Sequence, residues 1–363
     1  MNILYINFTD KVSGGETSLL YYLAELKKYV NPVVVSPKKG DFSNRLDAAG
    51  IKNYTFPLDL LSKKNPLLFL RTVYCLVRLI IREKIDIIHA NGTPSNQSGA
   101  IASVITGRPL ILHVQNFVEE KYYSKYFFRL TKKFIVLSQS VINHFPNSEK
   151  NKNKIVLLHH AVPKINNNKK SRFLHDELRI NRNKKLVAVI GLLEERKGHE
   201  YFIRAAKLVK NNACYLIVGD ALFTDDEYKN RIKKLVKDLN LSNVYFLGYR
   251  KDIHKILNEI DILVVPSINE PLGVIVLEAA SVSVPAIVFN SGALPEMIEN
   301  RKTGFIVQEK DYIELAKRID LLLQNDKLRK DTGKNARKKI EEEFSIEDNS
   351  KKILNIYREI KCK

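Results

Sequence analysis

The stretch from Asp261 to Ala280, DILVVPSINEPLGVIVLEAA, predicts a buried strand, a loop and a helix in succession. Ile262–Pro266 is rich in Val and Ile, as buried strands are. Pro271 and Gly273 keep the following residues out of regular helix, whereas Val274–Ser281 is a good helix former. A strand that leads through a short loop into a helix is one βα unit, the repeating element of a parallel sheet.

The same alternation of apolar runs and longer amphipathic runs extends through the whole chain. The first series of predicted strands comprises Asn2–Phe8, Pro32–Ser36, Ile85–Ala90, Leu110–Val114 and Phe134–Leu137. The second series comprises Leu186–Gly191, Tyr215–Gly219, Val244–Leu247, Ile262–Pro266 and Ala286–Phe289. The predicted fold class is therefore α/β, with two Rossmann-like, doubly wound domains.

The length of 363 residues suits two domains, and the composition indicates where one ends. We predict a first domain over residues 1–165 and a second over 185–345, joined by a linker at 166–184 that is rich in Asn and Lys. Residues 346–363 predict a final amphipathic helix, which we expect to pack back across the domain junction.

The composition, with 45% hydrophobic and 28% charged residues, is that of a globular protein. The three cysteines, Cys75, Cys214 and Cys362, are far apart and form no zinc or disulfide pattern. We predict no signal peptide, and the apolar region Leu67–Ile81 is shorter than the ~20 residues that span a bilayer. These features favour a location in the cytoplasm.

Two carboxylates, Glu270 and Glu278, bracket the predicted start of the helix near Gly273. Unpaired N–H groups and the positive end of the helix dipole make such a start an anion site, where a diphosphate could bind. Hydroxyl groups attached to that diphosphate could then donate hydrogen bonds to the two carboxylates. The alternative is that Glu270 solvates a loop and Glu278 faces water.

This region resembles the E-x7-E motif of the retaining glycosyltransferases of family 4, which have the GT-B fold. Further matching segments are Ile217–Asp220, Asn243–Gly248, Asp261–Ser267, Asn290–Glu296 and Thr303–Val307. The resemblance implies two domains facing a cleft, transfer of a sugar from a nucleotide-diphosphate sugar, and no metal or other cofactor. It also implies that Glu270 contacts the donor sugar and Glu278 the ribose, with Pro271, Leu272, Gly273 and Val274 in the donor-binding loop.

A basic pair, Arg196 and Lys197, precedes the predicted helix that follows Leu186–Gly191. A cation at this point would stabilise charge that develops on a leaving diphosphate, so Lys197 is a predicted catalytic residue. Members of the family usually have G-R-x4-K-G here, but this chain has Leu192 in place of the Arg. Arg196 is the candidate substitute, and the alternative is an ordinary solvated helix start.

In the first domain, Gly14 and Gly15 precede a predicted helix and match a glycine pair that lies next to the donor phosphates in the family. His89 and His113 both lie near strand ends. His113 matches the family histidine that faces the donor sugar, which makes it the stronger catalytic candidate; the alternative is a structural histidine. The family's Asn-Gly-Val-Asp pattern is replaced by the segment 159–163, HHAVP, and predicts no catalytic role.

The net charge of +20 suggests an anionic partner. Residues 1–165 hold 23 Lys and Arg against 11 Asp and Glu, a net of 23 − 11 = +12. Aromatic and basic residues interleave over Lys121–Arg129, which supports the hypothesis of peripheral attachment to the inner face of the cytoplasmic membrane. The alternative is a helix with its aromatic side chains in the core.

The predicted partners are a nucleotide sugar and a saccharide or lipid-linked saccharide acceptor, as in cell-surface polysaccharide or glycolipid synthesis. Nucleic-acid binding would also use the positive charge, but no dedicated motif supports it. Two other functions share the fold: a non-catalytic sugar-nucleotide-binding protein and a sugar-nucleotide epimerase. The spacing of Glu270 and Glu278 favours transfer over epimerisation.

Overall fold

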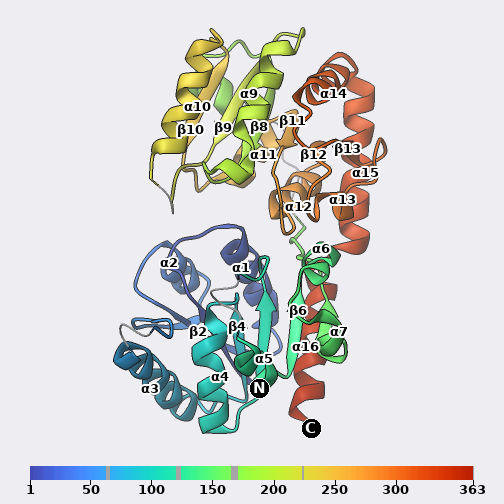
Figure 1. Cartoon of the computed structure of the whole chain (residues 1–363). Coiled ribbons are helices and arrows are strands. Elements are labelled where there is room, and N and C mark those ends of the chain that lie inside the picture. The colour runs from blue at the N-terminus through green and yellow to red at the C-terminus, as the bar shows by residue number, and fades with distance from the viewer. Residues whose placement is uncertain (63–65, 120–123, 165–170, 223–224, 363) are drawn as a thin grey trace. The chain divides into compact units, whose positions relative to one another are not determined.

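The computed structural model describes residues 1–62, 66–119, 124–164, 171–222 and 225–362 (Figure 1). The chain forms two compact units, each with its own parallel sheet. Unit 1 consists of Met1–Ala161 and Ile346–Lys363, and unit 2 of Val162–Ser345. Residues 165–170, at the start of the predicted linker, and 121–123, in the predicted basic and aromatic segment, lie outside the described residues.

Unit 1 contains a seven-stranded sheet in the order β3-β2-β1-β4-β5-β6-β7. Its strands are β1 Asn2–Asn7, β2 Asn31–Ser36, β3 Lys52–Thr55, β4 Ile87–Asn91, β5 Leu110–Val114, β6 Lys133–Val136 and β7 Ile155–Leu157. Its helices are α1 Gly14–Leu26, α2 Asp41–Ala48, α3 Pro66–Arg82, α4 Ser95–Thr106, α5 Lys125–Leu130, α6 Gln139–Asn143, α7 Ser148–Asn151, the 3-10 helix η2 Lys152–Lys154 and α16 Ile346–Lys361.

Unit 2 contains a six-stranded sheet in the order β10-β9-β8-β11-β12-β13. Its strands are β8 Lys185–Ile190, β9 Ala213–Val218, β10 Val244–Gly248, β11 Ile262–Val265, β12 Ala286–Phe289 and β13 Gly304–Val307. Its helices are α8 Phe173–Glu177, the 3-10 helix η3 Glu195–Lys197, α9 His199–Leu208, α10 Glu227–Asp238, α11 Ile253–Glu259, α12 Val274–Ser281, α13 Leu294–Met297, α14 Tyr312–Gln324 and α15 Asp326–Glu343.

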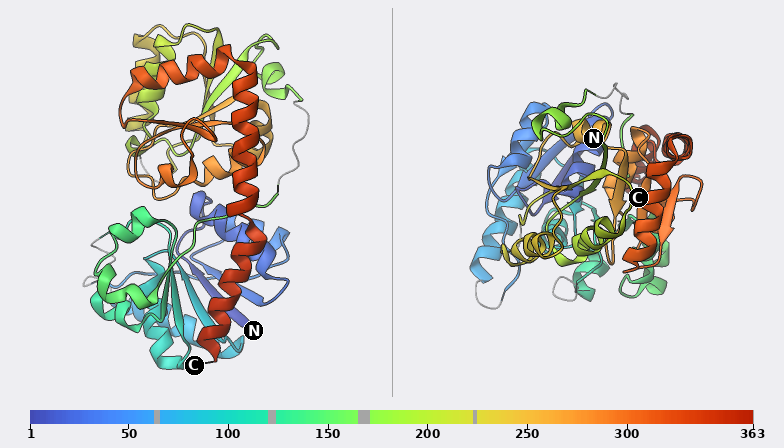
Figure 2. Two further views of the ribbon diagram at one scale, coloured as in Figure 1. Left: turned by 90° about the vertical axis from the view of Figure 1, so that its right-hand side faces the viewer. Right: turned by 90° about the horizontal axis from the view of Figure 1, so that it is seen from above.

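The last helix, α16, completes the core of unit 1 (Figure 2). Its Ile353 and Tyr357 are buried among apolar side chains of β1 and α1. The hydroxyl of Tyr357 lies 2.8 Å from the hydroxyl of Tyr5 and 2.6 Å from Nδ1 of His89. The opposite face of the sheet is covered by α4, which contacts β1, β4 and β5 and packs against α3 and α5.

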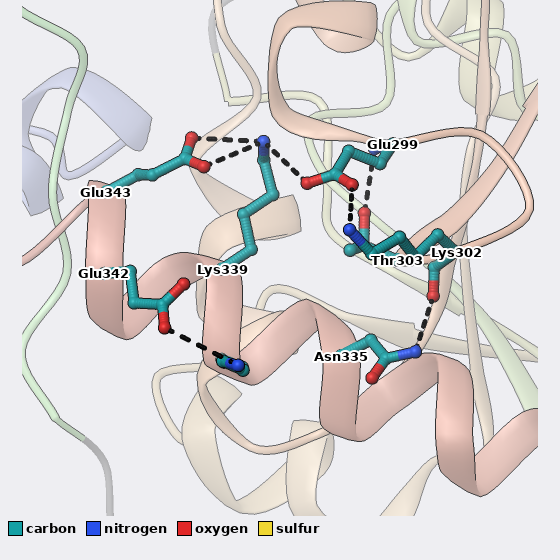
Figure 3. Close-up of polar contacts among 8 residues, drawn as sticks. Glu299, Lys302, Thr303, Asn335, Lys339, Glu342 and Glu343 are labelled. Carbon is teal, nitrogen blue, oxygen red and sulfur yellow. Dashed lines mark hydrogen bonds and ion pairs between the residues drawn. The ribbon is translucent and has the colours of Figure 1, made fainter.

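In unit 2, α15 supports α12 from outside the sheet. A Cβ atom at Gly333 of α15 would lie 2.0 Å from the carbonyl oxygen of Ser283, so the two segments approach as closely as backbone allows. The other end of α15 is tied to the loop before β13, where Lys339 Nζ lies 3.4 Å from Glu299 and 3.1 Å from Glu343 (Figure 3). These contacts hold α15 in place, and α15 in turn packs against α12.

The structure confirms the predicted α/β class and the two doubly wound sheets. Three strands were not predicted from the sequence: β3, β7 and β13. All three lie at sheet edges; β3, with the sequence KNYT, lacks the apolar run that marks an interior strand, and β7 is only three residues long. Within the described part of the chain, no helix is both long and apolar enough to cross a membrane.

Candidate active site

In each sheet the strand order reverses beside the first strand, between β1 and β4 in unit 1 and between β8 and β11 in unit 2. Ligands of doubly wound sheets bind at such a point, outside the carboxyl ends of the strands. In unit 2 the loops that leave β8 and β11 carry Lys197 and Glu270, respectively. The predicted donor-binding residues Lys197 and Glu270 therefore lie on the two loops at the switch point, where doubly wound sheets bind their ligands.

The loops after β8 and β11 are held together through their backbones. The N–H of Ile268 donates a 2.7 Å hydrogen bond to the carbonyl of Arg196. Gly198 has φ +65°, and a Cβ atom there would lie 2.0 Å from the carbonyl oxygen of Pro266. Only glycine permits this approach, which places Lys197 beside the loop that carries Glu270.

A third loop, after β12, contacts the backbone of Glu270. The N–H of Ala293 donates a 2.8 Å hydrogen bond to the carbonyl of Glu270. Gly292 has φ +57°, and a Cβ atom there would lie 2.2 Å from the Glu270 carbonyl oxygen and 2.7 Å from its nitrogen. The hydroxyl of Ser291 accepts from the N–H of Asn269 at 2.9 Å and lies 2.6 Å from a carboxylate oxygen of Glu309. The Glu270 backbone is thus fixed by its neighbours.

The side chains of Lys197 and Glu270 form an ion pair, with 2.6 Å between Lys197 Nζ and Glu270 Oε2. Arg196 lies further away, with its guanidinium 3.8 Å from the same oxygen and 2.7 Å from Glu194. Burial acts to raise the pKa of Glu270, but the charges of Lys197 and Arg196, with hydrogen bonds from Lys197 and Ser267, outweigh it and lower the pKa. Glu270 is therefore an ionised acceptor although its side chain is buried.

The helix α12 begins directly after this loop. Gly273 precedes it with φ +88°, and Leu272 and Val274 on either side are buried. Glu278 is also buried, on α12 and eight residues beyond Glu270. A helix start and two buried carboxylates in one βα unit can bind an anion together with hydroxyl groups. Among the described residues, no group of His, Cys, Asp and Glu side chains is placed to hold a metal ion.

The other predicted site residues belong to unit 1. Gly14 and Gly15 open α1, where the side chain of Glu16 accepts hydrogen bonds from the backbone and hydroxyl of Ser13. A Cβ atom at Gly15 would lie 3.6 Å from the side-chain oxygen of Gln115, at the end of β5. The glycine pair therefore lies at the carboxyl edge of this sheet, and its predicted role toward donor phosphates stays a prediction.

His113 lies at the end of β5 within a cluster of buried aromatic side chains. Its ring centroid is 5.5 Å from that of His89 and 5.7 Å from that of His160, and Tyr22 lies 6.2 Å away. Burial lowers the pKa of His113 to about 4, so the imidazole is neutral at physiological pH. The pKa values of His89 and His160 are lowered as well, by burial first and then by the neighbouring His113. The predicted contact of His113 with the donor sugar stays a prediction.

Reasoning from the sequence missed a ladder of amides across the strand ends of unit 1. The amide of Asn91 donates to the side-chain oxygen of Asn7 at 2.7 Å, and Gln115 donates to Asn91 at 2.8 Å. Each of the three residues ends or follows a buried strand, which is the signal that could have identified them. Lys197 and Glu270 are thus brought together in unit 2, while Gly14, Gly15 and His113 belong to unit 1.

Comparison with known proteins identifies the family of this chain. A family model described as Glycosyltransferase Family 4 matches residues 12–164, and one described as Glycosyl transferases group 1 matches residues 170–339. The Escherichia coli enzyme UDP-Gal:alpha-D-GlcNAc-diphosphoundecaprenol alpha-1,3-galactosyltransferase is 27% identical over 321 residues, which cover 79% of each chain.

A second relative, from Campylobacter jejuni, is N,N'-diacetylbacillosaminyl-diphospho-undecaprenol alpha-1,3-N-acetylgalactosaminyltransferase. It is 26% identical over 335 residues, or 86% of this chain and 87% of the relative. Among solved structures, Anabaena HepE in complex with UDP-glucose matches with a TM-score of 0.87 and 23% identity, covering 99% of this chain and 100% of HepE. With two family models that together span most of its length, this chain belongs to glycosyltransferase family 4 and is a glycosyltransferase of GT-B fold.

Proposed function

We propose that this glycosyltransferase transfers a sugar from a nucleotide-diphosphate sugar to a saccharide or lipid-linked saccharide, with retention of anomeric configuration. The observation that carries the proposal is the ion pair of Lys197 and Glu270, at the β8–β11 switch point and beside the start of α12. The ammonium group of Lys197 can bind the departing phosphate, and the carboxylate of Glu270 can accept hydrogen bonds from the hydroxyl groups of the sugar.

Lys197 is the group that meets the negative charge of the leaving nucleoside diphosphate. As the bond between the anomeric carbon and the phosphate oxygen breaks, charge accumulates on that oxygen, and a fixed ammonium stabilises it more than it stabilises the bound donor. The N–H groups at the start of α12, after Gly273, provide a second source of positive potential. The acceptor oxygen then bonds to the anomeric carbon, and its proton passes to the leaving phosphate.

Glu270 and Glu278 position the donor in this proposal. Glu270 stays ionised because of Lys197 and Arg196, so it can accept hydrogen bonds from sugar hydroxyls. Glu278, in the buried part of α12, would accept from the ribose hydroxyls. Neither carboxylate is assigned covalent attack. The rigid backbone around Glu270, fixed by Gly292 and Ala293, supports a positioning role because orientation depends on a fixed acceptor.

The names of the relatives suggest the substrate classes. The Escherichia coli and Campylobacter jejuni enzymes are named for acceptors linked to diphosphoundecaprenol, and Anabaena HepE was solved with UDP-glucose. We therefore favour a UDP-sugar as donor and a polyprenyl-diphosphate-linked saccharide as acceptor, at the inner face of the cytoplasmic membrane. This assignment places the enzyme in the synthesis of a cell-surface polysaccharide or glycolipid.

The test has two stages. A panel of UDP, GDP and ADP sugars is first screened by thermal shift, because a ligand that binds the native state raises the melting temperature. Donors that bind are then incubated with a short-chain polyprenyl-diphosphate saccharide, and the anomeric configuration of the product is determined by NMR. Transfer with the donor's own configuration supports the proposal. An inverted product, an epimerised donor, or binding without transfer to any acceptor of the panel would contradict it.

A further inference from the structure

Exposed apolar side chains are concentrated on three adjacent helices of unit 1. Among the described residues fifteen large hydrophobic side chains are exposed, and nine of them belong to these helices: five to α3, two to α4 and two to α5. The most exposed are Leu67 at 77%, Tyr126 at 70% and Ile81 at 68%. A monomeric protein rarely leaves so many large apolar groups in water on neighbouring elements, so this surface is a candidate interface.

The helix α3 is apolar on both sides. Phe69, Val73 and Leu76 are buried, as the inner face of an amphipathic helix should be. Leu67, Leu70, Tyr74 and Ile81 follow one another at spacings of three, four and seven residues, so they lie along the outer face. This face is exposed, although its residue types are those of a core.

The basic residues of the same helices are interleaved with these apolar groups. Arg71, Arg78 and Arg82 are exposed on α3, and Lys125 and Arg129 are exposed on α5. The guanidinium of Arg78 lies 5.7 Å from the ring centre of Tyr74, and Lys125 Nζ lies 5.3 Å from that of Tyr126. The three helices contain no Asp or Glu over their full described lengths. Their outer surface, which we name the α3–α5 face, is therefore apolar and positively charged.

The three helices form one continuous surface. α4 packs against α3 on one side and α5 on the other, and α3 and α4 lie side by side in Figure 1. Val104 and Ile105 of α4, each 60% exposed, add two apolar groups to this surface. Because α1, α2 and α16 pack on the opposite side of the sheet, the α3–α5 face lies on the side that α4 covers.

We propose that the α3–α5 face docks unit 1 onto a bilayer that contains anionic phospholipid. The inference rests on the proposed function only in that a lipid-linked acceptor would reside in that bilayer. Leucine, isoleucine and tyrosine side chains enter the boundary between headgroups and acyl chains, while arginine and lysine bind the anionic headgroups. No helix crosses the membrane in this arrangement; the face lies flat on it.

The chemistry of the face argues against two other occupants. A second copy of the chain that used the same face would bring its arginines against those of the first copy, and no acidic residue on these helices would compensate them. A nucleic acid would pair with the cations but would leave Leu67, Leu70 and Ile81 in water, since such sites use stacking aromatic rings. A lipid surface satisfies both the charges and the aliphatic groups.

The test measures co-sedimentation of the full chain with phosphatidylcholine vesicles that contain or lack phosphatidylglycerol. One variant carries Leu67→Gln, Leu70→Gln and Ile81→Gln, and its matched control carries Leu208→Gln and Ile313→Gln, which are exposed apolar positions of unit 2. A second variant carries Arg71→Gln, Arg78→Gln and Arg129→Gln. Its control carries Lys327→Gln, Lys330→Gln and Lys334→Gln, exposed on α15.

We expect the wild type to bind only vesicles with anionic lipid, and less at high salt. Each cation near such a surface contributes about fivefold to binding, so the variant with three arginines replaced should bind about a hundredfold more weakly. The apolar variant should lose about tenfold or more, and both controls should bind like the wild type. Circular dichroism and thermal melting confirm that each variant is folded.

Every other outcome overturns the proposal: no binding by the wild type, equal binding to neutral vesicles, undiminished binding by either face variant, self-association through the face, or binding of an oligonucleotide instead. Transfer to a water-soluble acceptor analogue is assayed in parallel. Loss of vesicle binding with intact transfer identifies the face as a docking surface. Vesicle binding without transfer would contradict the proposed function and leave the docking surface standing.

Discussion

The carboxyl edges of the two sheets are alike in topology and unlike in electrostatics. At the switch point of unit 2, Lys197 and Glu270 form an ion pair 2.6 Å long, and Glu270 is buried and ionised. At the corresponding edge of unit 1, the amides of Asn7 and Asn91 and the imidazole of His113 are neutral, and burial raises the pKa of the buried carboxyl group of Glu16. The same fold thus presents an ion pair at one edge and, at the other, polar groups whose charged forms are disfavoured by burial.

The difference follows from the neighbours that each buried polar group has. A buried carboxylate persists when a cation and backbone contacts hold it, and unit 2 supplies Lys197, Gly198 and Gly292 for that purpose. The histidines of unit 1 have one another and tyrosine hydroxyls as neighbours, so burial keeps them neutral. We infer that the edge which receives an anion is the one that maintains charge, and the following predictions test that contrast.

The largest effect is expected at the charged edge. Lys197→Ala should reduce kcat for sugar transfer by about 10³-fold, because the leaving phosphate loses its ammonium partner. The melting temperature of the variant should be recorded as well, since the unpaired Glu270 also destabilises unit 2. Lys197→Arg keeps the charge and should retain part of the activity. A loss of less than tenfold in the Ala variant would remove Lys197 from the mechanism.

The next effect tests whether the Glu270 backbone must be held rigidly. Gly292→Ala adds a methyl group that would lie 2.2 Å from the Glu270 carbonyl oxygen, so the loop must shift. We expect the free energy of unfolding to fall by about 3 kcal/mol and donor binding to weaken. Gly248→Ala is the matched control, because its φ of +64° is equally strained but no atom lies within 4 Å.

Denaturant unfolding of Gly248→Ala should show a loss of about 1 kcal/mol, from backbone strain alone. Equal losses in the two glycine variants would mean that the contact with Glu270 is not what restricts residue 292. Donor binding by calorimetry distinguishes a local change at the site from a general loss of stability, since only Gly292→Ala should weaken it.

A comparable effect is expected at the neutral edge, as a dependence on pH. The pKa of His113 is about 4 in the native state against an ordinary value of 6.5. Between these values the unfolded chain binds a proton that the native chain does not, so stability falls as the pH falls from 6.5 to 4. The shift corresponds to about 3 kcal/mol. This destabilising effect is absent above pH 6.5 and complete below pH 4.

The measurement is the free energy of unfolding of wild type and His113→Asn across this pH range. His199, in unit 2, has its pKa lowered to about 3 by burial and acts in the same direction, so the variant rather than the wild-type curve is decisive. The variant should show a shallower dependence on pH. Exposed His144 provides the control substitution His144→Asn, which should leave the dependence unchanged.

The smallest effect is expected for Arg196, the candidate substitute for the arginine that family members usually have at the position of Leu192. Its guanidinium is 3.8 Å from Glu270, pairs with Glu194 and is 41% exposed. Water therefore screens its charge, and Arg196→Gln should lower kcat/KM by about tenfold or less. A loss as large as that of Lys197→Ala would show that Arg196 replaces the missing arginine and that both cations hold the phosphates.

The sequence predicted those features that depend on local pattern. Interior strands such as β5 and β12 were predicted with their exact ends, because buried Val and Ile runs are visible in one dimension. Of the missed edge strands, β3 has the polar sequence KNYT, β7 has only three residues, and β13 is a four-residue segment that begins with glycine. The family resemblance and the GT-B fold were confirmed by the family models and by the structural match to HepE.

The sequence predicted the residues of the site but not the contacts that hold them in place. Lys197 and Glu270 could be selected from their places after strand ends, but their separation of 2.6 Å depends on contacts between loops that are distant in the sequence. The approach of Gly292 to the Glu270 backbone is of this kind, and so is the hydrogen bond of His89 to Tyr357. Glycine and tyrosine occur in too many settings for a single sequence to indicate such partners.

The placement of α16 in unit 1 has a consequence for synthesis on the ribosome. Residues 1–161 are translated first, yet Ile353 and Tyr357, which fill their core, are translated only after the whole of unit 2. The first unit to emerge is therefore the last that can reach native packing, whereas unit 2 has its complete sequence by residue 345. A premature stop codon shortly after residue 345 would damage the amino-terminal half of the enzyme and spare the half that had just been made.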